Sequence, residues 1–235
     1  MPNAELRVLS THAAMDVLNA LAPAFERTND CRLSFGFDPA KAVKRQVETG
    51  AAFDVAIVTR PVFEDLVAQG KMLPAPRAAI GRSGLGVSVR AGAPKPDISG
   101  VDAFKRALLA AKSVARSTEG TSGIYFGALI ERLGISAAMR DKIVLGPSGR
   151  VAELVARGDA EMAVQQVPEL LPVAGTHFVG PFPAELQLYS EFVAGVAGAS
   201  RHRDIAATFI EALTTPEALA LFAAAGIEPM PREGG

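Results

Sequence analysis

Short apolar segments and amphipathic segments alternate along most of the chain, and this alternation limits the fold more than any other feature. In the first part, strands are predicted at 6–10, 31–36 and 54–58, with helices over 13–27, from Pro39 to Gly50 and from Pro61 to Gly70. The segment 54–58 is a nearly continuous apolar run, which is typical of a strand covered on both faces. Regular alternation of strand and helix predicts an α/β fold with parallel sheets.

The alternation pauses at a proline-flanked strand, 85–90, and then restarts. Further strands are predicted at 113–116, 143–145 and 162–165, and a long apolar run covers 186–196. Helices are expected over 101–110, from 122 to a close at Gly134, near Ala137, and over 151–156, 203–213 and 216–225. The second half therefore repeats the pattern of the first.

Two internal similarities point to a duplicated architecture. VKRQVETGAAFDVAIVTRPVFEDLV, from Val43, aligns with VAELVARGDAEMAVQQVPELL, from Val151, and residues 8–21 parallel 114–129. We therefore expect two Rossmann-like α/β lobes with the same wiring, lobe 1 at 1–84 plus 195–235 and lobe 2 at 85–194. Segments 85–90 and 186–196 would be the outgoing and returning strands of a two-strand hinge.

Composition excludes several classes of function. The 235 residues are 49% hydrophobic with a formal net charge of −1 and no basic run, so nucleic acid is not an expected partner. Aromatic residues make up only 6%, without Trp, which argues against a sugar-stacking site. The one cysteine, Cys31, excludes an internal disulfide, and three scattered histidines predict no metal site. We expect no cofactor.

No apolar run approaches the length of a membrane span, and MPNAELRVLS lacks the regions of a secretory signal. The sequence as written predicts a cytoplasmic protein, or a periplasmic one whose leader has been removed. These two locations stay open.

The stretch SVARSTEGTSGIYFGALIERLG, residues 113–134, is a candidate anion cradle. A strand leads into a polar turn and then a helix start, where unpaired N–H groups and the helix dipole favour negative charge. The alternative is that Thr121 or Ser122 merely caps the helix. The candidate ligand-binding residues are Ser117, Gly120, Thr121, Ser122 and Gly123.

Other polar residues follow the remaining predicted strands. In open α/β sheets, ligands bind beyond the carboxyl ends of the strands. We expect the two edges to face each other across a cleft that holds a small anion. The residues at these ends are Ser10, Thr11, His12, Phe37, Asp38, Thr59, Arg60, Ser148, Arg150, Gln165 and Gln166.

Arginine and histidine could supply charge and proton transfer. Arg60, Arg90, Arg116 and Arg150 are candidates for gripping a carboxylate with two bonds, with a solvated surface role as the alternative for each. Arg60 and Arg150 are preferred because each follows a strand directly. His12 is positioned for general acid/base work, or for a neutral hydrogen bond to ligand or backbone.

Taken with these motifs, RVLSTHAAMDVLNALAPAFE, RQVETGAAFDVAIV, GTSGIYFGALIERLGI and VAELVARGDAEMAV resemble the type II periplasmic-binding-protein superfamily. The resemblance covers about 6–229 and is to the molybdate-binding-like branch of ABC-transporter solute-binding proteins. It implies two lobes, a two-strand hinge, an oxyanion or carboxylate in the cleft, a monomer and, after export, an ABC-transporter permease as partner.

In that branch a first-lobe serine would fall at Ala13, a Gly-Ser-Ser turn at 37–39, and a second-lobe Tyr at Gln165 or Gln166. Losing these donors favours a di- or tricarboxylate over a tetrahedral oxyanion.

The segment QQVPELLPVAGTHFVGPFPAELQ resembles another branch, which includes aconitate-isomerase-like proteins. That resemblance implies that His12 moves a proton while arginines and helix starts hold carboxylates. A binding protein, an isomerase and a cytosolic ligand sensor therefore remain as alternatives.

Overall fold

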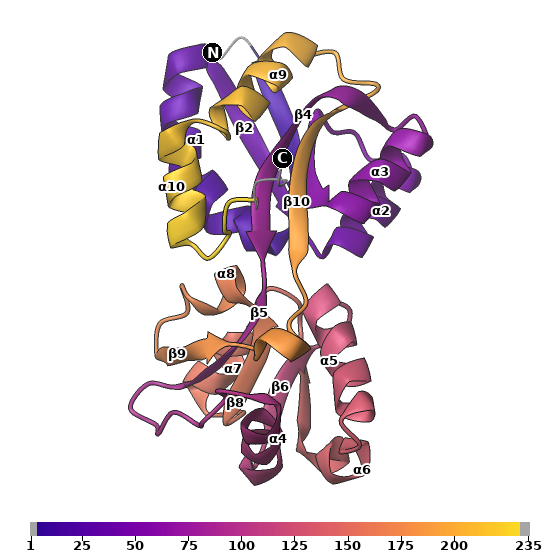
Figure 1. Ribbon diagram of the computed structural model, residues 1–235. Helices are drawn as coiled ribbons and strands as arrows, with labels where there is room; N and C mark the ends of the chain where they lie inside the picture. Colours follow the sequence, from indigo (N-terminus) through magenta and orange to yellow (C-terminus); the bar gives the residue numbers. More distant parts are fainter. Residues whose placement is uncertain (1–3, 231–235) are drawn as a thin grey trace, which may run out of the picture. The chain divides into compact units, whose positions relative to one another are not determined.

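The computed structural model describes residues 4–230 and divides them into two compact units, each built on its own sheet (Figure 1). Unit 1 contains residues up to Arg82 and those from Ser190 onward, and unit 2 is Ser83–Tyr189. Two connections therefore join the units. The expected lobe boundaries, 1–84 plus 195–235 and 85–194, stay a prediction, and 1–3 and 231–235 lie outside the described residues.

The sheet of unit 1 has the order β2-β1-β3-β10-β4. β1 pairs in parallel with β2 and β3, as predicted, whereas β10 is antiparallel to β3. β10 begins at the carboxyl end of β3, since Phe192 pairs with Thr59, and so runs back against it. The strands are β1 (Ala4–Ser10), β2 (Cys31–Phe37), β3 (Val55–Thr59), β4 (Met72–Ser83) and β10 (Ser190–Ala197).

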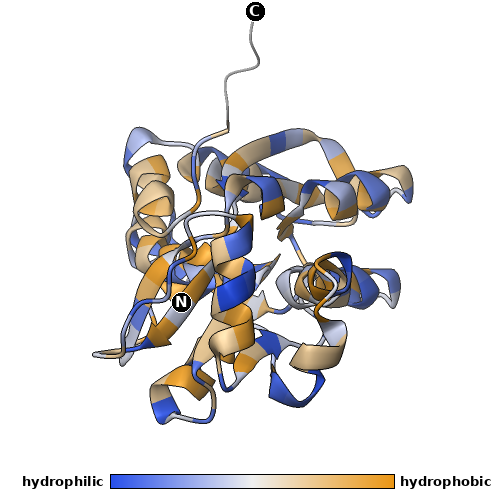
Figure 2. Cartoon of the chain, turned by 60° about the horizontal axis from the view of Figure 1, so that its bottom comes forward, coloured by the Kyte–Doolittle hydropathy of each residue, from blue (hydrophilic) through white to orange (hydrophobic). Residues whose placement is uncertain are grey.

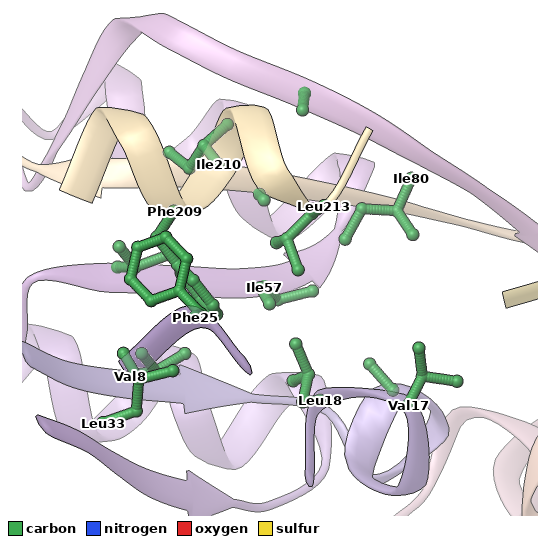
Figure 3. Packing of buried hydrophobic residues seen from close by; sticks show 14 of the residues in the cluster. Val8, Val17, Leu18, Phe25, Leu33, Ile57, Ile80, Phe209, Ile210 and Leu213 are labelled. Carbon is green, nitrogen blue, oxygen red and sulfur yellow. The ribbon is translucent and has the colours of Figure 1, made fainter. Parts of the chain in front are cut away.

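Helices cover both faces of this sheet (Figure 1). Val55 and Ile57 pack with α1 (Met15–Asn29), α9 (Arg203–Ala212) and α10 (Pro216–Ala224), while Ala56 and Val58 pack with α2 (Ala40–Glu48) and α3 (Arg60–Ala68). This two-residue alternation follows from the pleat of a strand. Figure 3 shows the first core, where the rings of Phe25 and Phe209 meet edge to face with centroids 5.0 Å apart.

Unit 2 repeats this plan with the order β7-β6-β8-β5-β9. β6 is parallel to β7 and β8, and β5 is antiparallel to β8 and β9. The core on one face includes residues of α4 (Val101–Ala110), α5 (Thr121–Arg132) and α6 (Ser136–Met139), and that on the other residues of α7 (Val151–Arg157) and α8 (Val167–Leu170). The strands are β5 (Leu85–Arg90), β6 (Val114–Ser117), β7 (Ile143–Gly146), β8 (Met162–Gln166) and β9 (Thr176–Pro181).

The predicted duplication is confirmed at the level of topology. β1, β2 and β3 occupy the same sheet positions as β6, β7 and β8, and in each sheet the fourth position is taken by a strand antiparallel to the third. The expectation of two Rossmann-like lobes joined by two hinge strands is therefore correct.

Two strands were missing from the sequence prediction, β4 and β9. β4 contains Pro74 and Pro76, and β9 ends at Pro181. Both strands lie at the edge of a sheet. A proline there can lack its N–H on the side that faces solvent, so no hydrogen bond to a neighbouring strand is lost and the strand can form. The strand within the predicted apolar run 186–196 begins only at Ser190, because a 3₁₀ turn, η3 (Ala184–Leu186), comes before β10.

Helix boundaries differ little from the predictions. The helix expected over 13–27 opens with a 3₁₀ turn, η1 (His12–Ala14), and another, η2 (Arg140–Lys142), follows α6. Gly158 closes α7 in the left-handed conformation, as predicted. Figure 2 shows hydrophilic and hydrophobic residues interleaved along the helices.

No single helix within 4–230 is long and apolar enough to cross a membrane. The consecutive helices α9 and α10, bent by 62°, pass that test only as a pair, and their Phe209 and Phe222 are buried in the core of unit 1.

Candidate functional site

In unit 1, the ends of three parallel strands bring the predicted residues together. Ser10 pairs with Phe37 on one side and Ile57 on the other. The Asp38 N–H donates to the carbonyl of Ser10 (3.1 Å), and the Thr11 N–H donates to that of Ile57 (3.0 Å). The chain segments after β1, β2 and β3 therefore meet at one edge.

Two hydroxyl groups at this edge are buried. The Ser10 Oγ donates to the carbonyl of Thr11 (3.1 Å). Thr11 is only 6% exposed, and its Oγ1 has no hydrogen-bond partner among the described residues. His12 follows, half-buried at the start of η1, and Ala13 contributes only a buried methyl group. Thr11 is thus the buried donor that this edge leaves unused.

The charged residues of this edge already have partners. Gln46 Nε2 donates to Asp38 Oδ2 (2.6 Å), and Arg60 Nε pairs with Glu191 Oε2 from β10. Thr59 is the N-cap residue of α3, but its side chain makes no capping hydrogen bond. The ring of Phe37 stacks on that of Phe35, with centroids 5.5 Å apart. Sequence reasoning missed Glu191, because nothing local connects it to a residue 131 positions earlier.

In unit 2, the start of α5 packs tightly against the end of β6. A Cβ built on Gly123 would lie 2.0 Å from the Ser117 carbonyl oxygen, and one on Gly120 would lie 2.6 Å from Ser117 Oγ. Glycine is required at Gly123 because no side chain fits there. Ser117 is 1% exposed, and its Oγ has no partner among the described residues.

No side chain caps α5. The N-cap is Gly120, and neither Thr121, which is exposed, nor Ser122, which is buried, closes the helix start. The first N–H groups of α5 are thus left to other acceptors. Arg116 has a bracing role here, since its Nη1 donates to the carbonyls of Gly123 (3.0 Å) and Ser117 (3.3 Å).

The turn after β7 brings Ser148 to this cradle but not the charge of Arg150. Ser148 Oγ lies 3.3 Å from the position of a Cβ on Gly120. The Arg150 side chain is 68% exposed and pairs with Glu153 of α7 at 3.2 Å. Arg90, at the far end of β5, packs beside Gly158 instead.

The end of β8 carries the most deeply buried polar side chain of this edge. Gln165 is 0% exposed, and neither its Oε1 nor its Nε2 has a hydrogen-bond partner among the described residues. Gln166 is buried beside it. Glu169, in α8, is half-buried, and burial raises the pKa of its carboxyl to about 7, with the neighbouring Gln165 amide opposing the rise.

Sequence reasoning missed Glu169, although Pro168 marks α8 as the counterpart of the helix that begins at Arg60-Pro61.

A hollow of about 800 Å³ in unit 1 lies at the opposite edge of its sheet. Its lining includes Arg7, Asp54 and His202, near the amino-terminal ends of β1 and β3. Asp54 has a structural role, because its carboxylate accepts hydrogen bonds from the Arg7 N–H (2.9 Å) and the Ser200 hydroxyl (2.6 Å).

Within 4–230, no three His, Cys, Asp or Glu residues form a metal-binding group.

Comparison with known proteins agrees with this architecture. Residues 6–228 match the family model of bacterial extracellular solute-binding proteins. An aconitate isomerase from a Pseudomonas species is 30% identical over 238 residues, which cover 99% of this chain and 90% of that protein.

Solved structures share the fold at lower identity. The periplasmic molybdate-binding protein of Azotobacter vinelandii superposes with a TM-score of 0.77 at 21% identity, over 94% of this chain and 97% of that one. The sulfate-binding protein of Mycobacterium tuberculosis gives 0.75 at 19% identity, over 97% and 87%. The chain therefore has the type II periplasmic-binding-protein fold.

Proposed function

The chain belongs to the family of bacterial extracellular solute-binding proteins, and we propose that it binds a small organic anion at the polar strand ends of its two units. Among the buried polar atoms without partners in the described residues, those at the strand ends support this proposal: Thr11 Oγ1 in unit 1, and Ser117 Oγ and the Gln165 amide in unit 2. Thr11 follows β1, Ser117 ends β6 and Gln165 is the last residue but one of β8, and α/β sheets bind ligands beyond such strand ends.

Energetics favour a ligand that partners these atoms. Leaving a buried donor or acceptor unpaired costs about 1–3 kcal/mol, and hydrogen bonds to a charged group contribute about 1.5–3 kcal/mol each. Micromolar affinity requires roughly 8 kcal/mol, so several such bonds together suffice where one does not. The uncapped start of α5 adds N–H groups and a favourable dipole.

We propose a di- or tricarboxylate as the ligand class. The relatives with this fold bind molybdate and sulfate, according to their names. Here Ala13 and Phe37 offer no hydroxyl at the unit 1 edge, so side-chain donors that would suit a tetrahedral oxyanion are missing at these positions. The Nε of Arg60 is paired with Glu191, and its remaining N–H groups suit a planar carboxylate.

The family also supports one of the two locations left open by the sequence. We propose that the protein acts in the periplasm as a monomer and delivers its ligand to the permease of an ABC transporter. The substrate-binding domain of a putative molybdenum ABC transporter from Clostridium difficile shares its fold.

The direct test is a thermal-shift screen of the folded protein with di- and tricarboxylates, molybdate, sulfate and tungstate. We expect a carboxylate to raise the melting temperature and the oxyanions to raise it less. Stabilisation by molybdate alone would contradict the ligand class, and no stabilisation by any anion would contradict the function.

A second candidate function rests on the relationship to aconitate isomerase, which extends over nearly the whole chain. In such a reaction a base removes a proton from the CH₂ carbon of the tricarboxylate, the double bond shifts, and a proton returns to the former vinylic carbon. His12 follows Thr11 directly and is the histidine placed at the unit 1 edge.

Conversion of trans- to cis-aconitate by the purified protein tests this candidate. His12→Ala is expected to abolish turnover while binding of trans-aconitate persists. His177→Ala, on the edge strand β9, is the matched control and should leave turnover unchanged. Turnover that survives in His12→Ala would exclude this histidine as the base.

A further inference from the structure

We propose that Arg116 positions the start of α5 and supplies the positive charge that favours an ionised carboxylate at this helix start. This inference rests on the proposed function and deepens it, because it assigns a source of charge and a charge selectivity to the unit 2 edge. Arg116 has this effect through α5, without touching the ligand.

Arg116 lies beneath the first turn of α5. On β6, Val114 and Arg116 share one face, because side chains alternate along a strand, and Val114 packs in the same core as Phe126 of α5. The Arg116 Nη1 donates to the carbonyl of Gly123 in the first turn (3.0 Å) and to that of Ser117 at the strand end (3.3 Å). One guanidinium group therefore connects the end of the strand to the start of the helix.

α5 presents two glycines to β6, and the guanidinium of Arg116 lies against them. A Cβ on Gly127 would lie 3.8 Å from the Arg116 Cζ, and one on Gly123 would lie only 2.0 Å from the Ser117 carbonyl oxygen. The helix therefore approaches the strand closely and covers the arginine side chain. The Nε of Arg116 is buried and has no hydrogen-bond partner among the described residues.

The charge of this guanidinium has no nearby counter-charge. Its hydrogen bonds go to backbone carbonyl groups, and within residues 4–230 it forms no ion pair with a carboxylate. α5 has no acidic residue in its first turn, and Glu119, in the turn before the helix, is exposed to water. The helix dipole adds partial positive charge at the same place, and a cation at a helix start is unfavourable by itself.

An ionised carboxylate at the start of α5 balances both positive charges. Its oxygens accept hydrogen bonds from the N–H groups of the first turn, which have no intrahelical partner. The guanidinium lies on the strand side of the same turn and attracts the carboxylate from there. A neutral amide or hydroxyl group can form the same hydrogen bonds but gains no such attraction. Arg116 therefore makes the unit 2 edge selective for the charge of the ligand.

Calorimetry of the full chain with trans-aconitate at constant pH tests this role through two substitutions. Arg116→Lys keeps the charge and a donor, whereas Arg116→Gln keeps a donor without the charge. At about 20 mM salt, we expect Arg116→Gln to weaken binding about tenfold and Arg116→Lys to stay within about threefold of the wild type. The difference between the two variants should narrow at about 500 mM salt, because salt screens charge interactions and leaves packing unchanged.

The matched control is Arg157→Gln in α7, which removes an exposed arginine that is paired with Asp159 at 3.0 Å. It should bind as the wild type does at both salt concentrations. Circular dichroism checks that each variant is folded, and Arg116→Met, which is neutral and close to lysine in shape, replaces Arg116→Gln if that variant does not fold.

Equal losses of affinity in Arg116→Lys and the neutral variant would indicate a purely structural role for this residue and overturn the proposal. Wild-type affinity in the neutral variant would overturn it as well. Both results leave the proposed function standing, because the wild type still binds. No binding of trans-aconitate or any other panel anion by the wild type would overturn both.

Discussion

The protonation of Glu169 affects the stability of unit 2. Its pKa is about 7 in the folded chain and 4.5 as the unperturbed value, so the folded state holds an extra proton between these values. The contribution of this carboxyl to the free energy of unfolding is therefore fully present below about pH 4.5. It falls as the pH rises toward about 7 and is constant above that. The free energy of unfolding should fall by at most about 3 kcal/mol across this window.

Denaturant unfolding at several pH values measures this effect. Glu169→Gln should lack the decrease and become the more stable form near neutral pH, whereas Glu153→Gln should follow the wild type. Parallel curves for the wild type and Glu169→Gln would show that the carboxyl is ionised throughout.

For single residues, the sequence predicted the positions of polar side chains at strand ends better than the partners of the charged ones. Apolar periodicity shows where a strand ends, and this predicted the places of Ser10, Thr11, Ser117 and Gln165. Arg60 was placed correctly at a strand end, but its partner Glu191 comes from a distant strand. Glu169 was missed because an acidic residue after proline in a short segment is typical of a solvated turn.

Among the elements, the junction of β6 and α5 is the most sterically constrained part of the candidate site. Gly123 and Gly127 lie one turn apart in α5, but a Cβ on Gly123 would overlap the Ser117 backbone, whereas one on Gly127 would meet nothing closer than 3.8 Å. The first glycine is needed for close approach, and the second is not.

We therefore predict opposite effects of the same substitution at these two positions. Gly123→Ala should destabilise the protein by several kcal/mol, or displace the α5 start and weaken anion binding, because backbone atoms must move. Gly127→Ala should be neutral or add up to about 1 kcal/mol through helix propensity. Thermal unfolding of both variants measures this, and equal stability would contradict the close packing.

The central strands and helices were predictable because they carry uninterrupted periodicity, whereas the edge strands β4 and β9 were not. Proline at such positions gives a local signal for a loop, and only the neighbouring strand, which is distant in sequence, overrides it. Element ends marked by glycine, such as Gly158, were located well because the left-handed conformation favours that residue.

For the molecule as a whole, the duplicated wiring was detectable from sequence because corresponding segments keep the same order of strand, polar turn and helix. The same duplication gives each unit a buried hydroxyl at its strand ends, Thr11 in one and Ser117 in the other. We propose that the strand ends of both units contribute to anion binding.

Calorimetric titration of three variants with trans-aconitate, or with the panel acid that binds most tightly, tests this proposal. Thr11→Val and Ser117→Ala each remove one buried hydroxyl, and Ser88→Ala removes a buried, unpartnered hydroxyl from the interior of β5 as the matched control. Thr11→Val and Ser117→Ala are each expected to weaken binding about tenfold or more, and Ser88→Ala is expected to leave it unchanged. Unchanged affinity in either Thr11→Val or Ser117→Ala would contradict it.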